Sequence, residues 1–149
     1  MPAAARHRGV VSDEADPTVV HSLAVTTDDV VTTIEANVRR DAGAVLRVTP
    51  PFSGRMRARI HVEHEDDPSE PICVPPERFV ESVPPFPSPD ATEDELRADS
   101  DVSYTRSRHR RRHEAAVEEW RASIREATLD RIHVPTDDGQ HQVRVSWLG

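Results

Sequence analysis

The sequence predicts an α+β fold in which a four-stranded, mostly antiparallel sheet is built from two hairpins and helices cover one of its faces. Three observations support this prediction. Apolar and polar residues alternate along residues 55–65. The pair Asp138-Gly139 favours a tight turn between two further alternating runs. Apolar residues recur at helical spacing before and after the first of these hairpins, which predicts the order helix, hairpin, helices, hairpin along the chain.

Each predicted hairpin joins two alternating strands through a turn. The first combines residues 44–49 with residues 55–65, and the second combines residues 131–135 with residues 141–148. In the strand of residues 55–65, alternate side chains are expected to face the core. These core residues are Met56, Ala58, Ile60 and Val62.

Helices are predicted on either side of the first hairpin. Thr26 caps the first helix with Asp29 three residues later, and an apolar stripe follows. A short acidic helix is expected at residues 92–99, and the longest helix at residues 103–129, where Trp120 is the expected core anchor. The stripe of the first helix consists of Val31, Ile34 and Val38.

The length of 149 residues suits one domain with its own core. Residues 1–20 show neither helical nor strand periodicity, which predicts a disordered N-terminal tail ahead of a single α+β domain at residues 21–149. Residues 66–89 contain eight prolines, and proline lacks the amide donor of a central strand. This segment is therefore expected to run over the surface.

Acidic residues outnumber basic residues by 27 to 19, all basic residues in that count are arginine, and the net charge is −8. This balance favours a salt-adapted protein, although a GC-rich genome also favours arginine over lysine. The chain has neither a long apolar stretch nor a secretory signal, so we expect a cytoplasmic protein without membrane contact. Cys73 is the only cysteine and is expected to be a small buried residue without a basic neighbour.

The outward positions of the two predicted hairpins are strongly basic. In one sheet they would form a flat array of guanidinium groups, which suits recognition of phosphate or carboxylate groups. The alternative is that these side chains pair across strands with Glu63, Glu65 and acidic helix residues. The candidate residues are Arg47, Arg55, Arg57, Arg59, His61, Arg131, His133 and Arg144.

A second basic patch is expected at the start of the longest helix. Either Asp99, Asp101 and Glu114 neutralise it internally, or it docks a partner. His109 and His113 stand at a spacing that suits a metal, but the arginines between them oppose one, and we expect no metal or cofactor. The patch consists of Arg106, Arg108, Arg110, Arg111 and Arg112.

Three stretches, residues 45–64, 73–97 and 141–149, resemble a small family of uncharacterised haloarchaeal proteins that carry a domain of unknown function. The resemblance covers roughly residues 21–149 and implies a salt-adapted, cytoplasmic protein. It brings neither an activity nor a catalytic residue.

The sequence therefore predicts a non-enzymatic binding module that recognises an anionic partner, such as an acidic protein. A nucleic-acid accessory protein is one alternative. However, the predicted solvent-facing side of the sheet carries no Phe, Tyr or Trp on which bases could stack. In addition, the screening length at about 1 M salt is about 3 Å, so electrostatic attraction to nucleic acid acts only at short range. The other alternative is an enzyme that uses His109 and His113, although the glycines form no nucleotide-binding or nucleophile motif.

Overall fold

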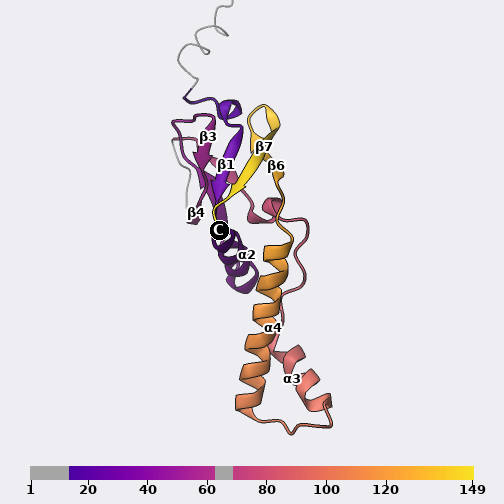
Figure 1. Ribbon diagram of the computed structural model, residues 1–149. Coiled ribbons are helices and arrows are strands. Elements are labelled where there is room, and N and C mark those ends of the chain that lie inside the picture. The colour runs from indigo at the N-terminus through magenta and orange to yellow at the C-terminus, as the bar shows by residue number, and fades with distance from the viewer. Residues whose placement is uncertain (1–13, 63–68) are drawn as a thin grey trace, which may run out of the picture. The chain divides into compact units, whose positions relative to one another are not determined.

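The computed structural model describes residues 14–62 and 69–149 (Figure 1). The chain divides into two compact units. The β-rich unit contains the described residues up to Glu81 together with Thr128–Gly149, and the helical unit contains Ser82–Ala127. Within the described ranges, no helix is both long enough and apolar enough to cross a membrane.

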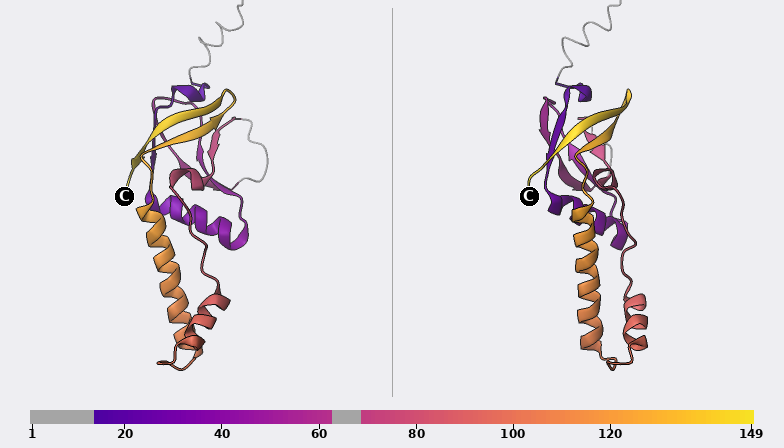
Figure 2. Two further views of the ribbon diagram at one scale, coloured as in Figure 1. Left: turned by 90° about the vertical axis from the view of Figure 1, so that its right-hand side faces the viewer. Right: turned by 45° about the vertical axis from the view of Figure 1, so that its right-hand side comes forward.

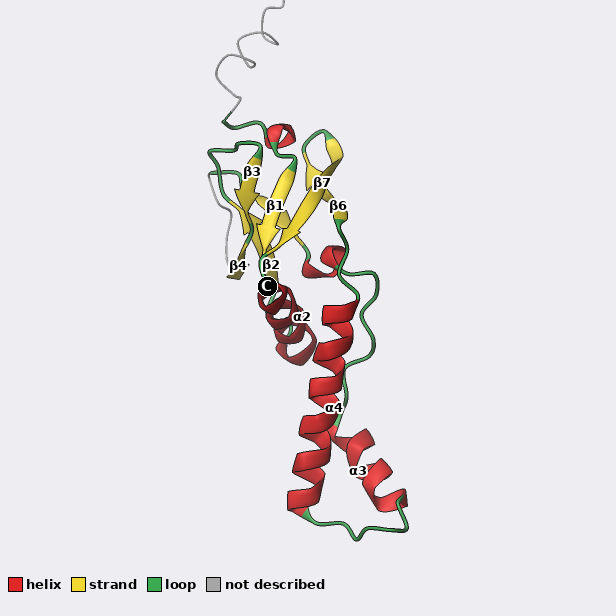
Figure 3. Ribbon diagram, in the orientation of Figure 1, coloured by secondary structure: helices red, strands yellow, loops and turns green. Residues whose placement is uncertain are grey.

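Seven strands of the β-rich unit form two sheets, as Figure 3 shows in yellow. Sheet A has the strand order β3-β1-β7-β6 and sheet B has the order β4-β2-β5. Strand β1 is parallel to both of its neighbours, whereas β6 and β7 are antiparallel, so sheet A is mixed. Sheet B is antiparallel throughout. The strands are β1 (Ser22–Val25), β2 (Ala44–Val48), β3 (Arg55–Arg57), β4 (Arg59–Val62), β5 (Ile72–Val74), β6 (Arg131–Thr136) and β7 (Gly139–Trp147).

The α+β class and the second hairpin are confirmed, but the prediction of one mostly antiparallel sheet is wrong. Pro50 and Pro51 follow β2 and carry no amide hydrogen, so they cannot continue its ladder. Strand β3 therefore pairs with β1 instead of β2. The parallel strand β1, which the sequence prediction lacked, separates β3 from the second hairpin.

The predicted strand of residues 55–65 changes sheets at Ala58. The Ala58 amide donates to the Ala24 carbonyl of sheet A (2.9 Å), and Arg59 begins β4 of sheet B. The Ala58 side chain is fully buried, so the change of direction takes place inside the core. The prediction of one continuous strand is thus wrong over residues 55–62, and its last three residues lie outside the described ranges.

Helix α2 (Thr27–Arg40) packs against β2 and lies beneath the strands in both views of Figure 2. Its Val31 and Ile34 are buried, whereas Val38 is 45% exposed. The predicted core positions Ile60 and Val62 are 39% and 36% exposed, so that part of the core prediction is wrong. Both lie on β4, one of the two edge strands of sheet B, beyond the strand that α2 mainly covers.

Hydrogen bonds fix both ends of α2. Thr26 accepts from the Asp29 amide (3.0 Å), which confirms the predicted cap. At the other end, Asn37 Nδ2 donates to the Ala44 carbonyl and the Ala44 amide donates to Asn37 Oδ1, both at 2.8 Å. This two-way bond joins the last turns of α2 to the first residue of β2.

Two short 3-10 turns complete the β-rich unit, η1 (Pro17–Val19) and η2 (Pro76–Phe79). Val20, directly after η1, is fully buried. Phe79 is also fully buried and meets the ring of Trp147 edge to face at 6.2 Å. The proline-rich segment therefore contributes a core residue to this unit.

The helical unit consists of α3 (Pro89–Ala98) and α4 (Arg106–Glu126), and α3 packs against α4 (Figure 3). Ser88 caps α3, so the helix begins at Pro89, three residues before the predicted start. Trp120 is buried as predicted; its indole N–H donates to the Pro84 carbonyl (2.9 Å), and Phe86 lies edge-on to it at 5.0 Å. The aromatic pair anchors the chain before α3 onto α4.

We expect Asn37→Ala to lower the free energy of unfolding by about 1–3 kcal/mol, because it leaves two groups of Ala44 without their partner. Urea unfolding followed by circular dichroism measures the effect. Thr32→Ala, an exposed change on the same helix, is the control and should stay within about 0.5 kcal/mol of the wild type. Equal effects of the two substitutions would contradict the role given to the Asn37 amide.

Candidate anion-binding face

The structure distributes the eight predicted face residues over two sheets. Sheet B holds Arg47, Arg59 and His61. Sheet A holds the other five, which are Arg55, Arg57, Arg131, His133 and Arg144. A single basic plane of all eight is therefore absent, because the change of sheets at Ala58 separates Arg55 and Arg57 from Arg59 and His61.

Three of the sheet A arginines lie in one row across all four strands. Ser22 of β1 is the register partner of Arg55 on one side and of Arg144 on the other. Arg144 in turn is the partner of Arg131. Residues that face each other across neighbouring strands point to the same side of a sheet, so the row presents all three guanidinium groups on one face. We call Arg55, Arg131 and Arg144 the arginine row.

Arg131 and Arg144, two side chains of like charge, stand directly opposite each other on β6 and β7. The neighbouring pair along the two segments, Asp130 and Val145, is hydrogen-bonded, since the Val145 amide donates to the Asp130 carbonyl (2.8 Å). Antiparallel pairs alternate, so Arg131 and Arg144 are a non-hydrogen-bonded pair, the type in which side chains approach most closely. Like charges in this position destabilise a sheet. Within the described ranges, no member of the arginine row forms an ion pair with a carboxylate.

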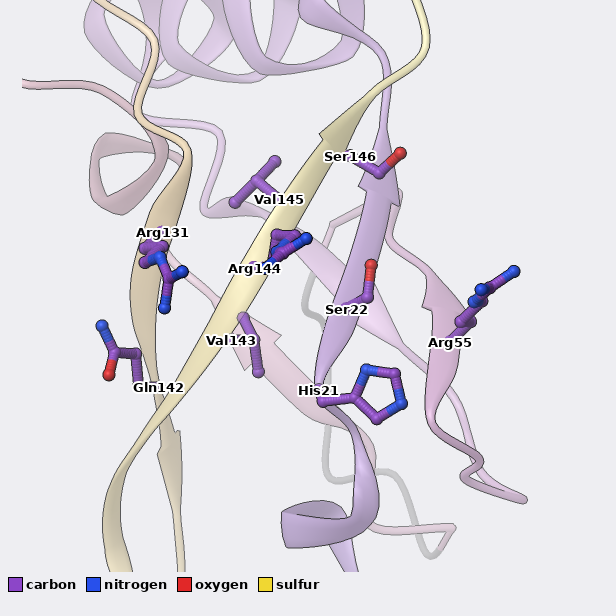
Figure 4. Close-up of a pocket in the computed structure, with 9 residues that line it drawn as sticks. All are labelled: His21, Ser22, Arg55, Arg131, Gln142, Val143, Arg144, Val145 and Ser146. Atoms are coloured by element: carbon purple, nitrogen blue, oxygen red, sulfur yellow. The ribbon is translucent and has the colours of Figure 1, made fainter.

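The arginine row borders a hollow of about 610 Å³ in the face of sheet A (Figure 4). Hydrogen-bonding side chains of His21, Ser22, Gln142 and Ser146 line the space around the guanidinium groups. Figure 4 shows Ser22 on β1, between Arg55 and Arg144, and His21 directly before that strand. No carboxylate and no Phe, Tyr or Trp is among the described residues that line this hollow.

The other two sheet A candidates have structural contacts. Arg57 lies opposite Ala24, in the row next to the arginine row, and its guanidinium group is 3.9 Å from the Asp29 carboxylate. His133 is exposed, and its backbone carbonyl accepts from Arg78 (3.0 Å). Arg57 is thus partly neutralised by the first turn of α2, so we leave both residues outside the candidate site.

Sheet B holds a smaller basic group. Arg47 Nη1 lies 3.3 Å from His61 Nε2, and Arg47 is the register partner of Arg59 on one side and of Cys73 on the other. The expectation of a buried cysteine without a basic neighbour is wrong, because Cys73 is only half-buried and faces Arg47. The strand β5 places its apolar neighbours Ile72 and Val74, not the thiol, in the core.

The predicted second basic patch lies on the first two turns of α4, and internal pairing involves only part of it. Arg112 is 3.4 Å from the Asp99 carboxylate. Arg108 donates to the carbonyl and the hydroxyl of Ser103, both at 2.8 Å. Among the described residues, no ion pair is formed by the other three arginines of the patch, which are Arg106, Arg110 and Arg111. The expected pairing with Glu114 is therefore not made.

The two histidines of α4 hydrogen-bond to α3. His109 Nε2 lies 2.9 Å from the Pro89 carbonyl, which only accepts, so this nitrogen donates. His113 Nδ1 lies 3.1 Å from the Thr92 hydroxyl. The two rings are 6.4 Å apart, and the described residues contain no group of three or more His, Cys, Asp or Glu that could hold a metal.

Sequence reasoning found the arginines of the site but missed its other hydrogen-bonding groups. Residues Ser22 and His21 belong to β1 and the residue before it, where the sequence prediction placed no strand. The signal was short: only Leu23 and Val25 alternate with polar or small residues before the cap of α2. Gln142 and Ser146 stand two residues before and after Arg144 on a correctly predicted strand, so alternation already placed them on its face, although the prediction counted only the basic residues.

We expect Arg144→Gln to raise the free energy of unfolding by about 0.2–1 kcal/mol at low salt, because it removes the like charge opposite Arg131. The gain should shrink in molar KCl, where screening weakens the repulsion. Urea unfolding at both salt concentrations measures it. Arg40→Gln removes the same charge from the end of α2 and should give no gain. A loss of stability in Arg144→Gln at low salt would contradict the repulsive pair.

Comparison with known proteins places the chain in a family without assigning it a function. No curated protein and no solved structure matches it. Residues 11–149, nearly the whole chain, match the family described as Domain of unknown function (DUF8009). The chain therefore belongs to the family of the domain of unknown function DUF8009.

Proposed function

We propose that the protein is a binding module that recognises anionic groups of a partner through the arginine row of sheet A. The observation that carries this proposal is the register that aligns Arg55, Arg144 and Arg131 across Ser22 without a carboxylate among the described residues lining the hollow. Guanidinium groups offer planar forks of donors that match carboxylate and phosphate oxygens. A bound anion would also neutralise the repulsion between Arg131 and Arg144.

The partner that fits this face best is an acidic protein surface. The three arginines are exposed, and hydrogen-bonding side chains line the hollow between them together with Val143 and Val145. Single-stranded nucleic acid binds sheets through exposed aromatic rings, and the described lining of this hollow contains no Phe, Tyr or Trp. Carboxylates on a facing protein need no such stacking, since paired N–H···O bonds suffice.

We place this module in the cytosol of a salt-adapted cell. The net charge of −8 and the use of arginine for all 19 basic residues support this setting. At about 1 M salt the screening length is about 3 Å, so distant charges contribute little. Recognition at such salt concentrations depends on close, bidentate contacts, which the planar guanidinium group of arginine forms and the ammonium group of lysine does not.

The enzymatic alternative has less support. Its two histidines, His109 and His113, hydrogen-bond to Pro89 and Thr92 of α3, which gives them a structural role.

The proposal is tested by titrating the labelled protein with hexaglutamate in low and molar KCl and following backbone amides by NMR. Arg144→Gln and Arg131→Gln should each weaken binding about tenfold or more, since a hydrogen bond to a charged group contributes about 1.5–3 kcal/mol. Arg40→Gln changes the net charge equally and should leave the Kd unchanged.

A single-stranded oligonucleotide serves as the competing probe. Tighter binding of the oligonucleotide that depends on the same arginines would assign the face to nucleic acid rather than protein. Equal binding of hexaglutamate by the wild type, Arg144→Gln and Arg131→Gln would refute the role of the arginine row.

A further inference from the structure

We propose that the helical unit contains a second, separate binding site, which takes a short organic anion with an apolar body, such as a short-chain alkyl carboxylate. The site is a hollow of about 330 Å³ lined by Leu96, Val102, Arg108, Arg111 and Arg112. It lies between the end of α3, the loop that follows it and the start of α4. Neither the arginine row nor any other residue of sheet A contributes to it.

The cationic rim of the hollow comes from one face of α4. Residues three and four apart are neighbours on a helix, so Arg108, Arg111 and Arg112 present their side chains together. Ser103 orients the first guanidinium group through two hydrogen bonds of 2.8 Å, and Asp99 lies 3.4 Å from the third. The rim is therefore held in place by its own loop.

The three positive charges of this rim are only partly neutralised by neighbouring carboxylates. Asp99 is the single carboxylate in ion-pair contact with the three arginines among the described residues, and it contacts Arg112. The bonds of Arg108 go to neutral oxygens, and Arg111 forms no ion pair within the described chain. Three neighbouring cations on one helix face repel one another, and an anion between Arg108 and Arg111 would relieve that repulsion.

The other two side chains that line the hollow, Leu96 and Val102, are apolar, and we call them its floor. Val102 is half-buried and supplies accessible hydrocarbon to the lining, whereas Leu96 is almost fully buried and offers little surface of its own. The aliphatic stems of the three arginines add apolar surface to the same hollow. An inorganic anion would use only the rim, whereas a carboxylate with a hydrocarbon chain would use rim and floor together. The volume is at the small end of the range for ligand sites, about 300–1,000 Å³, which limits the ligand to a short chain.

Chain-length dependence distinguishes this site from nonspecific attraction to arginine. We would titrate the labelled full-length protein with acetate, butanoate and hexanoate at constant KCl and follow backbone amides by NMR. Each fully buried methylene strengthens binding about fourfold, so even partial burial should make hexanoate bind at least about tenfold more tightly than acetate. The amides that shift should be those of Leu96, Val102 and residues 108–112.

Three variants separate the contributions of rim and floor. Arg111→Gln should weaken acetate and hexanoate alike, whereas Val102→Ser should reduce only the advantage of hexanoate. Arg106→Gln, an exposed arginine of the same helix outside the hollow, is the matched control and should change neither. A wild-type-like amide spectrum for each variant shows that the fold is retained.

Equal affinity for acetate and hexanoate would overturn the proposal. So would a wild-type hexanoate affinity in Arg111→Gln, or shifts confined to Ser22, Arg55 and Arg144 of sheet A. The last result would leave the proposed function of the arginine row intact, so the two sites fail independently.

Discussion

The β-rich unit depends on the residue at which the chain leaves sheet A and enters sheet B. At Ala58 the amide still bonds to Ala24 of sheet A, while the next residue opens β4 of sheet B. Because its side chain is fully buried, this position has no room for a larger residue without repacking. The crossing determines which cations share a face: Arg55 is aligned with Ser22 and Arg144, whereas Arg59 lies opposite Arg47 in the other sheet.

Both candidate sites place arginines at neighbouring positions with fewer paired carboxylates than arginines. In sheet A the strands align Arg131 with Arg144, and in the helical unit the turns of α4 align Arg108 with Arg111. Such arrangements reduce stability, and natural proteins retain them mainly where function requires them. This is unexpected in a chain of net charge −8, which has carboxylates available for pairing. The shared physical feature is a locally positive surface on an acidic protein.

Local signals allowed part of this structure to be predicted. The cap of α2 by Thr26, the hairpin around Asp138-Gly139 and the burial of Trp120 all follow from residues near one another in sequence. The arrangement of strands is set by distant pairing. Strand β1 has only four residues, so its periodicity was weak, and its insertion between β3 and β7 divided the predicted sheet. The arginines of the site were therefore identified by type and alternation, but their grouping required the register.

The most direct test of this account is the pattern of interstrand nuclear Overhauser effects around β3 in the labelled protein. The structure predicts contacts between the backbones of Arg57 and Ala24 and a strong Hα–Hα contact between Arg131 and Arg144, as expected for a non-hydrogen-bonded antiparallel pair. A continuous first hairpin would instead bring Arg57 opposite Thr49. Observation of that contact, together with the absence of contacts between Arg57 and Ala24, would contradict the crossing at Ala58 and with it the arginine row.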